Sequence, residues 1–463
     1  NNENLDMVDP INFDIVTYED AIAASMSLVD FERNINNPGH SYFHLERMKM
    51  MMEFLENPQD KVPAVHVAGT KGKGSTAAMV SSILSDAGYR CGLTTSPHLH
   101  SIRERISISG ESISKEEFAR IVRKLWPTVQ LLDHVGKWGP ISWFEFIISC
   151  AFYYFHESKV DFQVVETGLG GRLDATNIIN PLVSVITSIS LDHTSILGDT
   201  IQEITLEKSG IIKTGRPVVL AGQNEEAQMV LYKVARDKLA PLVDSAEQFN
   251  VNVLSMDMSG QVLAIEGTSC SYNFRLPLLG RHQVENAMAA IATVQEIHDQ
   301  GFHVPDSSVE SGLEGVCWPA RMEVISSSDP VVMVDGAHNP YSIKVLIKAI
   351  GDHFTYQNLI VIWGILKGHD LDAMLAELKE LDPILIPVSS RHPKSVSTDK
   401  IEAAARRHGL RVDATSETVS AGMDHALKIS NQLDLILGTG SLSIAAECIE
   451  VLNSMEPEEY GNL

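Results

Sequence analysis

The stretch Ala64-Val-His-Val-Ala-Gly-Thr-Lys-Gly-Lys-Gly-Ser-Thr76 decides how the first part of the chain folds. Residues 64–68 are apolar and favour a β-strand, and glycines recur between residues 69 and 74. A helix over residues 75–87 follows, because its apolar residues recur at helical spacing. In such a strand, turn and helix, glycines let successive N–H groups converge on phosphate oxygens, and the helix N-terminus adds a favourable dipole.

The turn departs from the strict phosphate-loop pattern GxxxxGK[ST]. Gly69 lies only three residues before Gly72, and Gly74 separates Lys73 from Ser75. An ordinary turn with exposed lysines is the alternative, but the flanking strand and helix favour a nucleotide, with Lys73 bridging its terminal phosphates. No Asn-Lys-x-Asp guanine-reading motif is present, which favours ATP over GTP. The predicted ATP contacts of this loop are Gly69, Thr70, Lys71, Gly72, Lys73, Gly74 and Ser75.

Length and hydrophobic pattern predict two α/β domains. The chain has 463 residues, more than one hydrophobic core usually organises. Apolar segments without alternation are typical of a parallel sheet that is covered on both faces; they lie at residues 162–166, 183–189 and 217–221. We therefore expect a P-loop ATPase-type domain with a parallel sheet over residues 1–318, and a smaller Rossmann-like α/β domain over residues 319–463.

The remaining predicted elements follow the same periodicity argument. In the first domain, we predict helices over residues 17–34, 43–55, 144–155 and 286–299, with short strands between residues 248 and 279. In the second domain, we predict strands over residues 331–334, 359–363, 384–388 and 433–437, and helices over residues 341–354, 371–381 and 399–408.

Charge and composition exclude several classes of function. The chain carries 36 basic and 60 acidic residues, a net charge of -24, which argues against binding to nucleic acid or to an anionic membrane. The apolar run 144–155 is too short to span a bilayer. Five scattered cysteines without a CxxC pair indicate free thiols in a reducing compartment. We expect the cytoplasm or the mitochondrial matrix, since the sequence begins without Met and a removed targeting segment would not be visible.

Further motifs occur in a fixed order along most of the chain. They are Gly69-Thr-Lys-Gly-Lys-Gly-Ser75, Thr95-Ser-Pro-His-Leu99, Val164-Val-Glu-Thr-Gly-Leu-Gly-Gly-Arg-Leu-Asp-Ala-Thr-Asn177, Leu191-Asp-His193, Glu207-Lys-Ser-Gly-Ile-Ile-Lys213, His282-Gln-Val-Glu-Asn286, Trp318-Pro-Ala-Arg321 and Asp335-Gly-Ala-His-Asn-Pro340. This ordered set resembles the folylpolyglutamate synthase and dihydrofolate synthase family of the Mur ligase superfamily. The resemblance implies that ATP phosphorylates a carboxylate and that the amine of glutamate then displaces the phosphate.

The resemblance implies two magnesium ions and a modified lysine. Ser96, Glu166 and His193 match the metal ligands. For Glu166 a buried ion pair is the alternative, and His193 taken alone favours a hydrogen-bonded core histidine, because magnesium prefers oxygen ligands. Lys208 matches a lysine that becomes carbamylated; a surface lysine beside Glu207 is the reading that the residues alone favour. Lys73, Lys208 and His193 are the catalytic candidates.

The same resemblance assigns the remaining substrate contacts. Its ATP contacts beyond the loop are Asn286, Arg321, Asp335 and His338. For the pterin, Asp174 and Phe144 are candidates, and an aromatic ring can stack on a pterin, although Phe144 is equally compatible with the core. Ser390 and His392 are candidates for glutamate, with a surface loop as the alternative.

Several functions remain open within and outside this family. The form His338-Asn339-Pro340 resembles dihydrofolate synthase members, so the predicted substrates are dihydropteroate, L-glutamate and ATP, handled by a monomer. The alternatives are a folylpolyglutamate synthase, which lengthens a glutamate tail, and a bifunctional enzyme. A Mur cell-wall ligase fits the 164–177 motif less well. From another class, a nucleotide-binding regulator without catalysis would keep the loop and lose the other residues.

Overall fold

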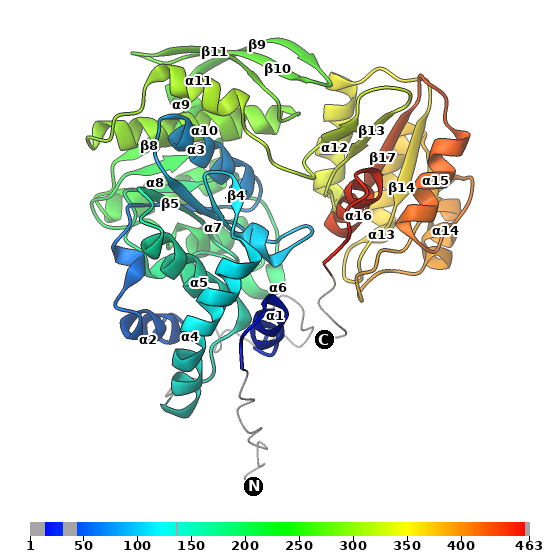
Figure 1. The fold of residues 1–463 in the computed structure, drawn as a ribbon. Coiled ribbons are helices and arrows are strands. Elements are labelled where there is room, and N and C mark those ends of the chain that lie inside the picture. Colours follow the sequence, from blue (N-terminus) through cyan, green and yellow to red (C-terminus); the bar gives the residue numbers. More distant parts are fainter. Residues whose placement is uncertain (1–13, 31–43, 136–137, 459–463) are drawn as a thin grey trace.

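The protein has the expected α/β fold with two domains (Figure 1). The computed structural model describes residues 14–30, 44–135 and 138–458. The first domain is built on an eight-stranded sheet of order β4-β3-β2-β5-β1-β6-β7-β8. Its strands are β1 (Ala64–Ala68), β2 (Cys91–Thr94), β3 (Ile106–Ile108), β4 (Glu111–Ser112), β5 (Phe162–Glu166), β6 (Val183–Ile186), β7 (Val218–Leu220) and β8 (Leu242–Asp244). All pairs are parallel except those made by β3.

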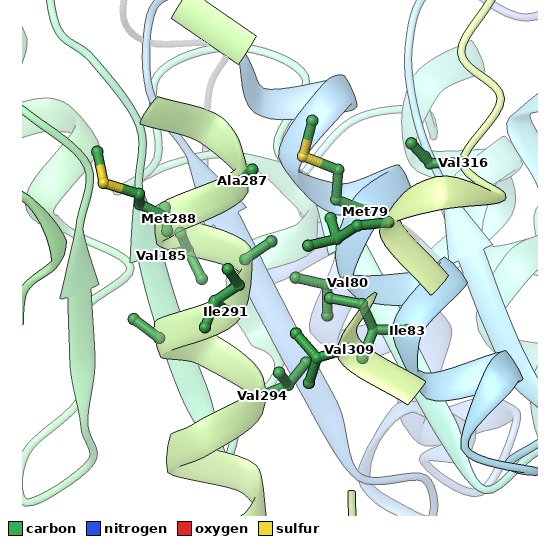
Figure 2. Close-up of a cluster of buried hydrophobic side chains, with 14 of the residues drawn as sticks. Met79, Val80, Ile83, Val185, Ala287, Met288, Ile291, Val294, Val309 and Val316 are labelled. Atoms are coloured by element: carbon green, nitrogen blue, oxygen red, sulfur yellow. The ribbon is translucent and has the colours of Figure 1, made fainter. Parts of the chain in front are cut away.

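Helices cover both faces of this sheet. Against one face pack α3 (Lys73–Asp86), α10 (Arg281–Asp299) and α11 (Asp306–Glu314). Figure 2 shows this packing: Ile83 of α3 and Val309 of α11 lie close to Val294 of α10, all buried. The other face is covered by α1 (Tyr18–Met26), α2 (Glu46–Phe54), α4 (Lys115–Val135), α5 (Trp143–Glu157), α7 (Ile201–Ser209) and α8 (Glu225–Asp237). Burial on both faces explains why the strands lack alternation.

A small antiparallel sheet extends from the first domain toward the second (Figure 1). It consists of β9 (Asn250–Asp257), β10 (Gly260–Glu266) and β11 (Ser271–Leu276). Its contact in the second domain is His353, at the end of α12 (Pro340–His353): the His353 Nδ1 atom lies 2.9 Å from the carbonyl oxygen of Asp257, and Nε2 accepts the N–H of Gly280 at 3.0 Å.

The second domain is a doubly wound sheet of order β12-β13-β17-β14-β15-β16, in which only β12 pairs antiparallel. Its strands are β12 (Glu323–Ser326), β13 (Val331–Val334), β14 (Leu359–Trp363), β15 (Ile384–Pro387), β16 (Arg411–Val412) and β17 (Leu435–Thr439). On one face lie α12, α13 (Leu371–Leu378) and α14 (Thr398–Arg407), and on the other α15 (Val419–Ile429) and α16 (Leu442–Leu452).

Most predicted elements are confirmed, with differences at their ends. The strands over 64–68 and 162–166 have the predicted bounds. The helix predicted from residue 17 ends at Met26, and residues 31–34 lie outside the described part. The helix predicted over 286–299 begins earlier, at Arg281, and the strand predicted over 433–437 is Leu435–Thr439. The strand predicted over 183–189 ends at Ile186, because the carbonyl of Ser188 turns toward the glycine loop.

Short elements complete the chain: α6 (Thr194–Leu197), α9 (Ser245–Gln248), and 3-10 turns at Pro58–Asp60, Ile102–Arg105, Ala175–Ile178 and Lys379–Leu381. Within the described residues, every helix is too short or too polar to cross a lipid bilayer.

Candidate active site

A cavity of about 1290 Å3 lies between the two domains. The glycine loop after β1 lines it from the first domain, and residues 335–338, which follow β13, line it from the second. Both segments follow the carboxyl ends of parallel strands, where open α/β sheets bind their ligands. Nearly all predicted site residues line this cavity; Ser390 does not.

The glycine loop packs closely against the side chains of Asn286 and Trp318. Gly72 caps α3 with a φ of 86°, and a Cβ atom there would lie 2.3 Å from Asn286 Oδ1. A Cβ on Gly74 would lie 2.6 Å from the ring of Trp318. The N–H groups of Thr70 and Lys71 donate to the carbonyl of Ser188, at 2.9 and 3.2 Å. The N–H groups that remain for a phosphate are therefore those at the start of α3.

Glu166 is a buried carboxylate at the end of β5, with 4% of its surface exposed. Its Oε2 atom accepts the N–H of Ser96 at 3.0 Å, and Oε1 lies 3.9 Å from Lys73 Nζ. Burial raises the pKa of Glu166, whereas Lys73 and the Ser96 N–H lower it. Two of the predicted metal ligands are thus adjacent, next to the lysine of the loop.

His193 lies in the same cavity, but its side chain is 58% exposed. Its Nε2 atom is 4.0 Å from Asp192 Oδ1, while Asp192 Oδ2 accepts a hydrogen bond from Lys71 at 3.1 Å. Partial desolvation by the surrounding groups and the charges of the neighbouring lysines lower the pKa of His193, although Asp192 raises it. Over residues 14–30, 44–135 and 138–458, no three His, Cys, Asp or Glu side chains converge as metal ligands would. Of the three predicted metal ligands, Glu166 and Ser96 are therefore the two that contact each other, through the Ser96 N–H.

Lys208 lies near the end of α7 with only 4% of its surface exposed. Its Nζ atom donates to the carbonyl oxygen of Gly69 at 2.7 Å. Burial lowers the pKa of Lys208 to about 7, and the charge of Lys73 adds to this effect. Its neighbour Glu207 pairs instead with Arg172, at 2.8 Å. Lys208 is therefore not a surface lysine paired with Glu207, the reading that the residues alone favoured.

The two pterin candidates, Phe144 and Asp174, also line the cavity. The ring of Phe144 lies against Gly168, where a Cβ atom would be 2.5 Å from the ring edge. Asp174 is buried and accepts N–H groups from Leu169 at 2.8 Å and Thr176 at 3.0 Å, together with the Thr176 hydroxyl. Burial raises the pKa of Asp174. Asp174 thus fixes the loop that carries Leu169 while it faces the cavity.

The second domain contributes side chains that are fixed by their own backbone. Asp335 accepts the N–H groups of Met322 at 3.0 Å and Ala337 at 2.8 Å; burial raises its pKa and Arg321 lowers it. His338 Nδ1 lies 2.8 Å from the carbonyl oxygen of Gly336, and burial lowers the pKa of His338 to about 4. The positive charge of Arg321 also lowers the pKa of Glu166. Charged groups of the two domains therefore interact across the cavity.

Ser390 and His392 follow β15, but they are placed differently. His392 lines the cavity. Ser390 is buried, with its N–H donating to Ser395 Oγ at 3.1 Å. The structure therefore brings only His392 of this predicted pair to the cavity.

Some cavity residues were not predicted as site residues. The side-chain amide of Gln283 donates to Ser75 Oγ at 3.3 Å, and the ring of Trp318 packs against Gly74. His369 packs edge to face against His338, with ring centroids 5.4 Å apart. Gln283 and Trp318 lie inside motifs that the sequence contains, and His369 follows β14, so the rule for strand ends would have indicated it.

The chain matches two known domain families and several known proteins. Residues 148–294 match the Mur ligase middle domain, and residues 320–442 match the Mur ligase glutamate ligase domain. The dihydrofolate synthase/folylpolyglutamate synthase of Bacillus subtilis (strain 168) is 36% identical over 408 residues, which cover 85% of this chain and 92% of the relative.

Two solved structures are also similar. Mycobacterium tuberculosis folylpolyglutamate synthase, complexed with ADP and AMPPCP, has a TM-score of 0.82 and 34% identity, covering 90% of this chain and 96% of that one. An Escherichia coli structure in complex with DHPP and ADP has a TM-score of 0.81 and 26% identity, covering 95% of this chain and 98% of that one.

The fold and the site define an ATP-dependent ligase of the Mur type, which forms an amide bond. The chain belongs to the folylpolyglutamate synthase and dihydrofolate synthase family.

Proposed function

We propose that this ligase is a dihydrofolate synthase, which joins L-glutamate to 7,8-dihydropteroate through an acyl phosphate. The observation that carries the proposal is a single cavity that connects the glycine loop with Phe144 and Asp174. An ATP phosphate at the start of α3 and a flat ring beside Phe144 would then share one enclosed space. The form His338-Asn339-Pro340 and the DHPP bound to the Escherichia coli relative support dihydropteroate as the acceptor.

In the first step, an oxygen of the substrate carboxylate attacks the terminal phosphorus of ATP, and ADP leaves. In the second step, the neutral amine of glutamate attacks the acyl carbon, and inorganic phosphate and a proton are released. Both steps bring anions together in a chain of net charge -24. Lys71, Lys73 and Arg321 supply positive charge around the loop, and Asn286, Asp335 and His338 complete the proposed nucleotide contacts.

Magnesium fits the oxygen donors beside the loop. Glu166 and the Ser96 hydroxyl would hold it together with phosphate oxygens and water, since magnesium usually takes one or two carboxylates and substrate phosphates. His193 is the proposed third ligand. When bound, the ion would neutralise charge on the phosphates. Burial raises the pKa of Glu166, and a bound cation would lower it and so favour the ionised carboxylate.

Lys208 fits the proposed carbamate. A lysine with a pKa of about 7 has a large neutral fraction, about half, near neutral pH, and only the neutral amine reacts with carbon dioxide. The carbamate keeps one N–H group, which would preserve the hydrogen bond to the carbonyl of Gly69. Its new carboxylate would supply the anion that a second metal ion requires.

The incoming glutamate is assigned to the loop after β15. His392 reaches the cavity and is the proposed contact, with Ser390 supporting the loop from its buried position. Phe144 and Asp174 are the proposed pterin contacts. In this proposal, the amine donor binds in the second domain and the acyl acceptor in the first.

The decisive experiment compares dihydropteroate with tetrahydrofolate as substrates and counts the glutamates in each product. We expect glutamate-dependent ADP release with dihydropteroate, a product with one glutamate, and little turnover with a UDP-muramyl substrate. The variant Lys73→Ala should weaken ATP binding in a parallel titration and serves as the control for the nucleotide site.

Folylpolyglutamate synthase is the second candidate, because the Bacillus subtilis relative carries both names. Turnover with tetrahydrofolate alone would replace our proposal by this candidate. Comparable turnover with both substrates would indicate a bifunctional enzyme.

A further inference from the structure

Two glutamates of α16 are buried although they belong to a helix at the surface of the second domain. Glu447 and Glu450 lie about one turn apart, with 8% and 5% of their surface exposed. A buried carboxylate is unfavourable unless it accepts hydrogen bonds or pairs with a cation. The partners of both glutamates come from two loops that border the cavity, one from each domain.

The first loop covers residues 95–105 of the first domain. His100 Nδ1 lies 2.9 Å from Glu450 Oε1, and because a carboxylate only accepts, this nitrogen carries the proton. Leu99 packs against the hydrophobic core of the second domain. At the other end of the loop, Ser96 donates its N–H to Glu166. The loop therefore contacts the proposed metal ligand at one end and α16 at the other.

Glu104 makes this loop compact. Its side chain accepts three successive backbone N–H groups, from Leu99 at 2.7 Å, His100 at 2.8 Å and Ser101 at 2.7 Å. A shift of His100 consequently moves its neighbours as well.

The second loop covers residues 389–395 of the second domain. The Arg391 side chain donates to Glu450 Oε2, and the Arg391 N–H donates to Glu447 Oε1 at 2.7 Å. His392, the next residue, lines the cavity. Burial opposes the ionisation of Glu450, but the hydrogen bonds from His100 and Arg391 hold its pKa below the usual range. The two oxygens of one carboxylate are thus divided between the two loops.

We propose that Glu450 is a positioning residue that connects the phosphate side of the cavity with the amino acid side. Through His100 it fixes the loop of Ser96, and through Arg391 it fixes the loop of His392. The inference rests on the proposed function, in which the loop of His392 receives glutamate. Glu450 itself is not among the residues that line the cavity.

Kinetics of His100 variants test this connection. In His100→Ala, we expect the KM for glutamate to rise roughly 5- to 10-fold, as for the loss of one charge-assisted hydrogen bond. His100→Asn should restore most of the loss, because its side-chain amide can donate from a similar position. An unchanged KM for glutamate in His100→Ala would overturn the proposal.

Glu458→Gln is the matched control. Glu458 also connects the end of the chain to the first domain, accepting the hydroxyl of Tyr18 at 2.9 Å and lying 3.5 Å from Arg103 Nε. This contact does not involve residues 389–395, so we expect a wild-type KM for glutamate. An increase equal to that of His100→Ala would show a general effect of domain contacts and would contradict a specific role of Glu450.

A double variant tests whether one carboxylate carries the coupling. If His100 and Arg391 act through Glu450, the combined variant His100→Ala/Arg391→Ala should lose less in kcat/KM for glutamate than the product of the single losses. If the loss in kcat/KM of the double variant equals the product of the two single losses, the two residues act independently and the proposal is overturned.

Amide hydrogen exchange gives a readout that needs no turnover. In His100→Ala, we expect faster exchange in residues 389–395 as well as in residues 95–105. Exchange that changes only in residues 95–105 would reduce His100 to a local structural role. A wild-type chain that turns over neither pterin substrate would refute the proposed function, and the exchange experiment would still decide on Glu450.

Discussion

The two sides of the cavity hold their ligand-facing groups in different ways. On the first-domain side the backbone itself is fixed, because Gly72 and Gly74 lie too close to Asn286 and Trp318 to admit a Cβ atom. On the second-domain side the groups are side chains, such as His338, which is oriented by the carbonyl oxygen of Gly336. The phosphate site is therefore preformed by packing, whereas the opposite side depends on individual hydrogen bonds.

The largest effect is expected at Lys208, which donates a hydrogen bond to Gly69 of the glycine loop. Lys208→Ala should lower kcat about 100-fold, as for other groups that support a metal site, while ATP still binds. Transfer of the wild type to buffer free of bicarbonate should lower its activity reversibly, and the variant should not respond. Steady-state kinetics with and without bicarbonate check this; near-wild-type turnover of the variant would refute the carbamate.

Gly72→Ala tests whether the backbone cradle requires glycine. The strain of a positive φ and the contact with Asn286 should cost about 1–3 kcal/mol, which weakens ATP binding about 10- to 100-fold. Gly88→Ala is the control, because Gly88 also has a positive φ, of 91°, but its Cβ would meet open space. Calorimetric titration should show normal ATP affinity for the control; equal losses in both variants would refute a cradle-specific effect.

The pH dependence of stability reports on Lys208 directly. Its folded pKa of about 7 lies below the ordinary 10.5, so between these values the unfolded chain binds one more proton than the folded chain. Stability therefore rises with pH in this window, by about 1.4 kcal/mol per pH unit relative to Lys208→Met. Urea unfolding at pH 7.5 and 9 in buffer free of bicarbonate measures the difference; parallel slopes would mean that the amine is not desolvated.

The smallest effect is expected on the second-domain side. His338→Ala removes one side chain and leaves the glycine loop intact, so the KM for ATP should rise only about 3- to 5-fold, in line with a single hydrogen bond. Kinetics under the same conditions as for Gly72→Ala check the order of the two effects. A larger loss in His338→Ala would invert the comparison between the two sides.

Local pattern was sufficient to predict the glycine loop and some of the strands, whereas β2, β3, β4, β8, β12 and β16 were not predicted. Residues 64–76 carry their signal in consecutive positions, as do the strand over 162–166 and the alternation of strands and helices after residue 330. The ends of elements were less accurate, because tertiary contacts set them. The strand β6 stops at Ile186 since the carbonyl of Ser188 is used by the N–H groups of Thr70 and Lys71.

Site properties that depend on contacts distant in sequence could not be predicted from the residues alone. The burial of Lys208 requires its hydrogen bond to Gly69, 139 residues away in the sequence. His392 lines the cavity and Ser390 does not. This difference depends on the path of the loop that carries both residues. Glu447 and Glu450 have the spacing of surface helix residues, and only the fold shows that both are buried.

The hydrogen bonds of His353 to Asp257 and Gly280 give the two domains a further attachment beside the covalent connection after Glu314 (Figure 1). Together with the hydrogen bonds of Glu450 to His100 and of Glu458 to Tyr18, they join the domains at separate places. Attachments at several places restrict rotation of one domain against the other, so the glutamate loop should keep its position opposite the phosphates. Part of this accuracy would come from the small sheet, whose residues do not line the cavity.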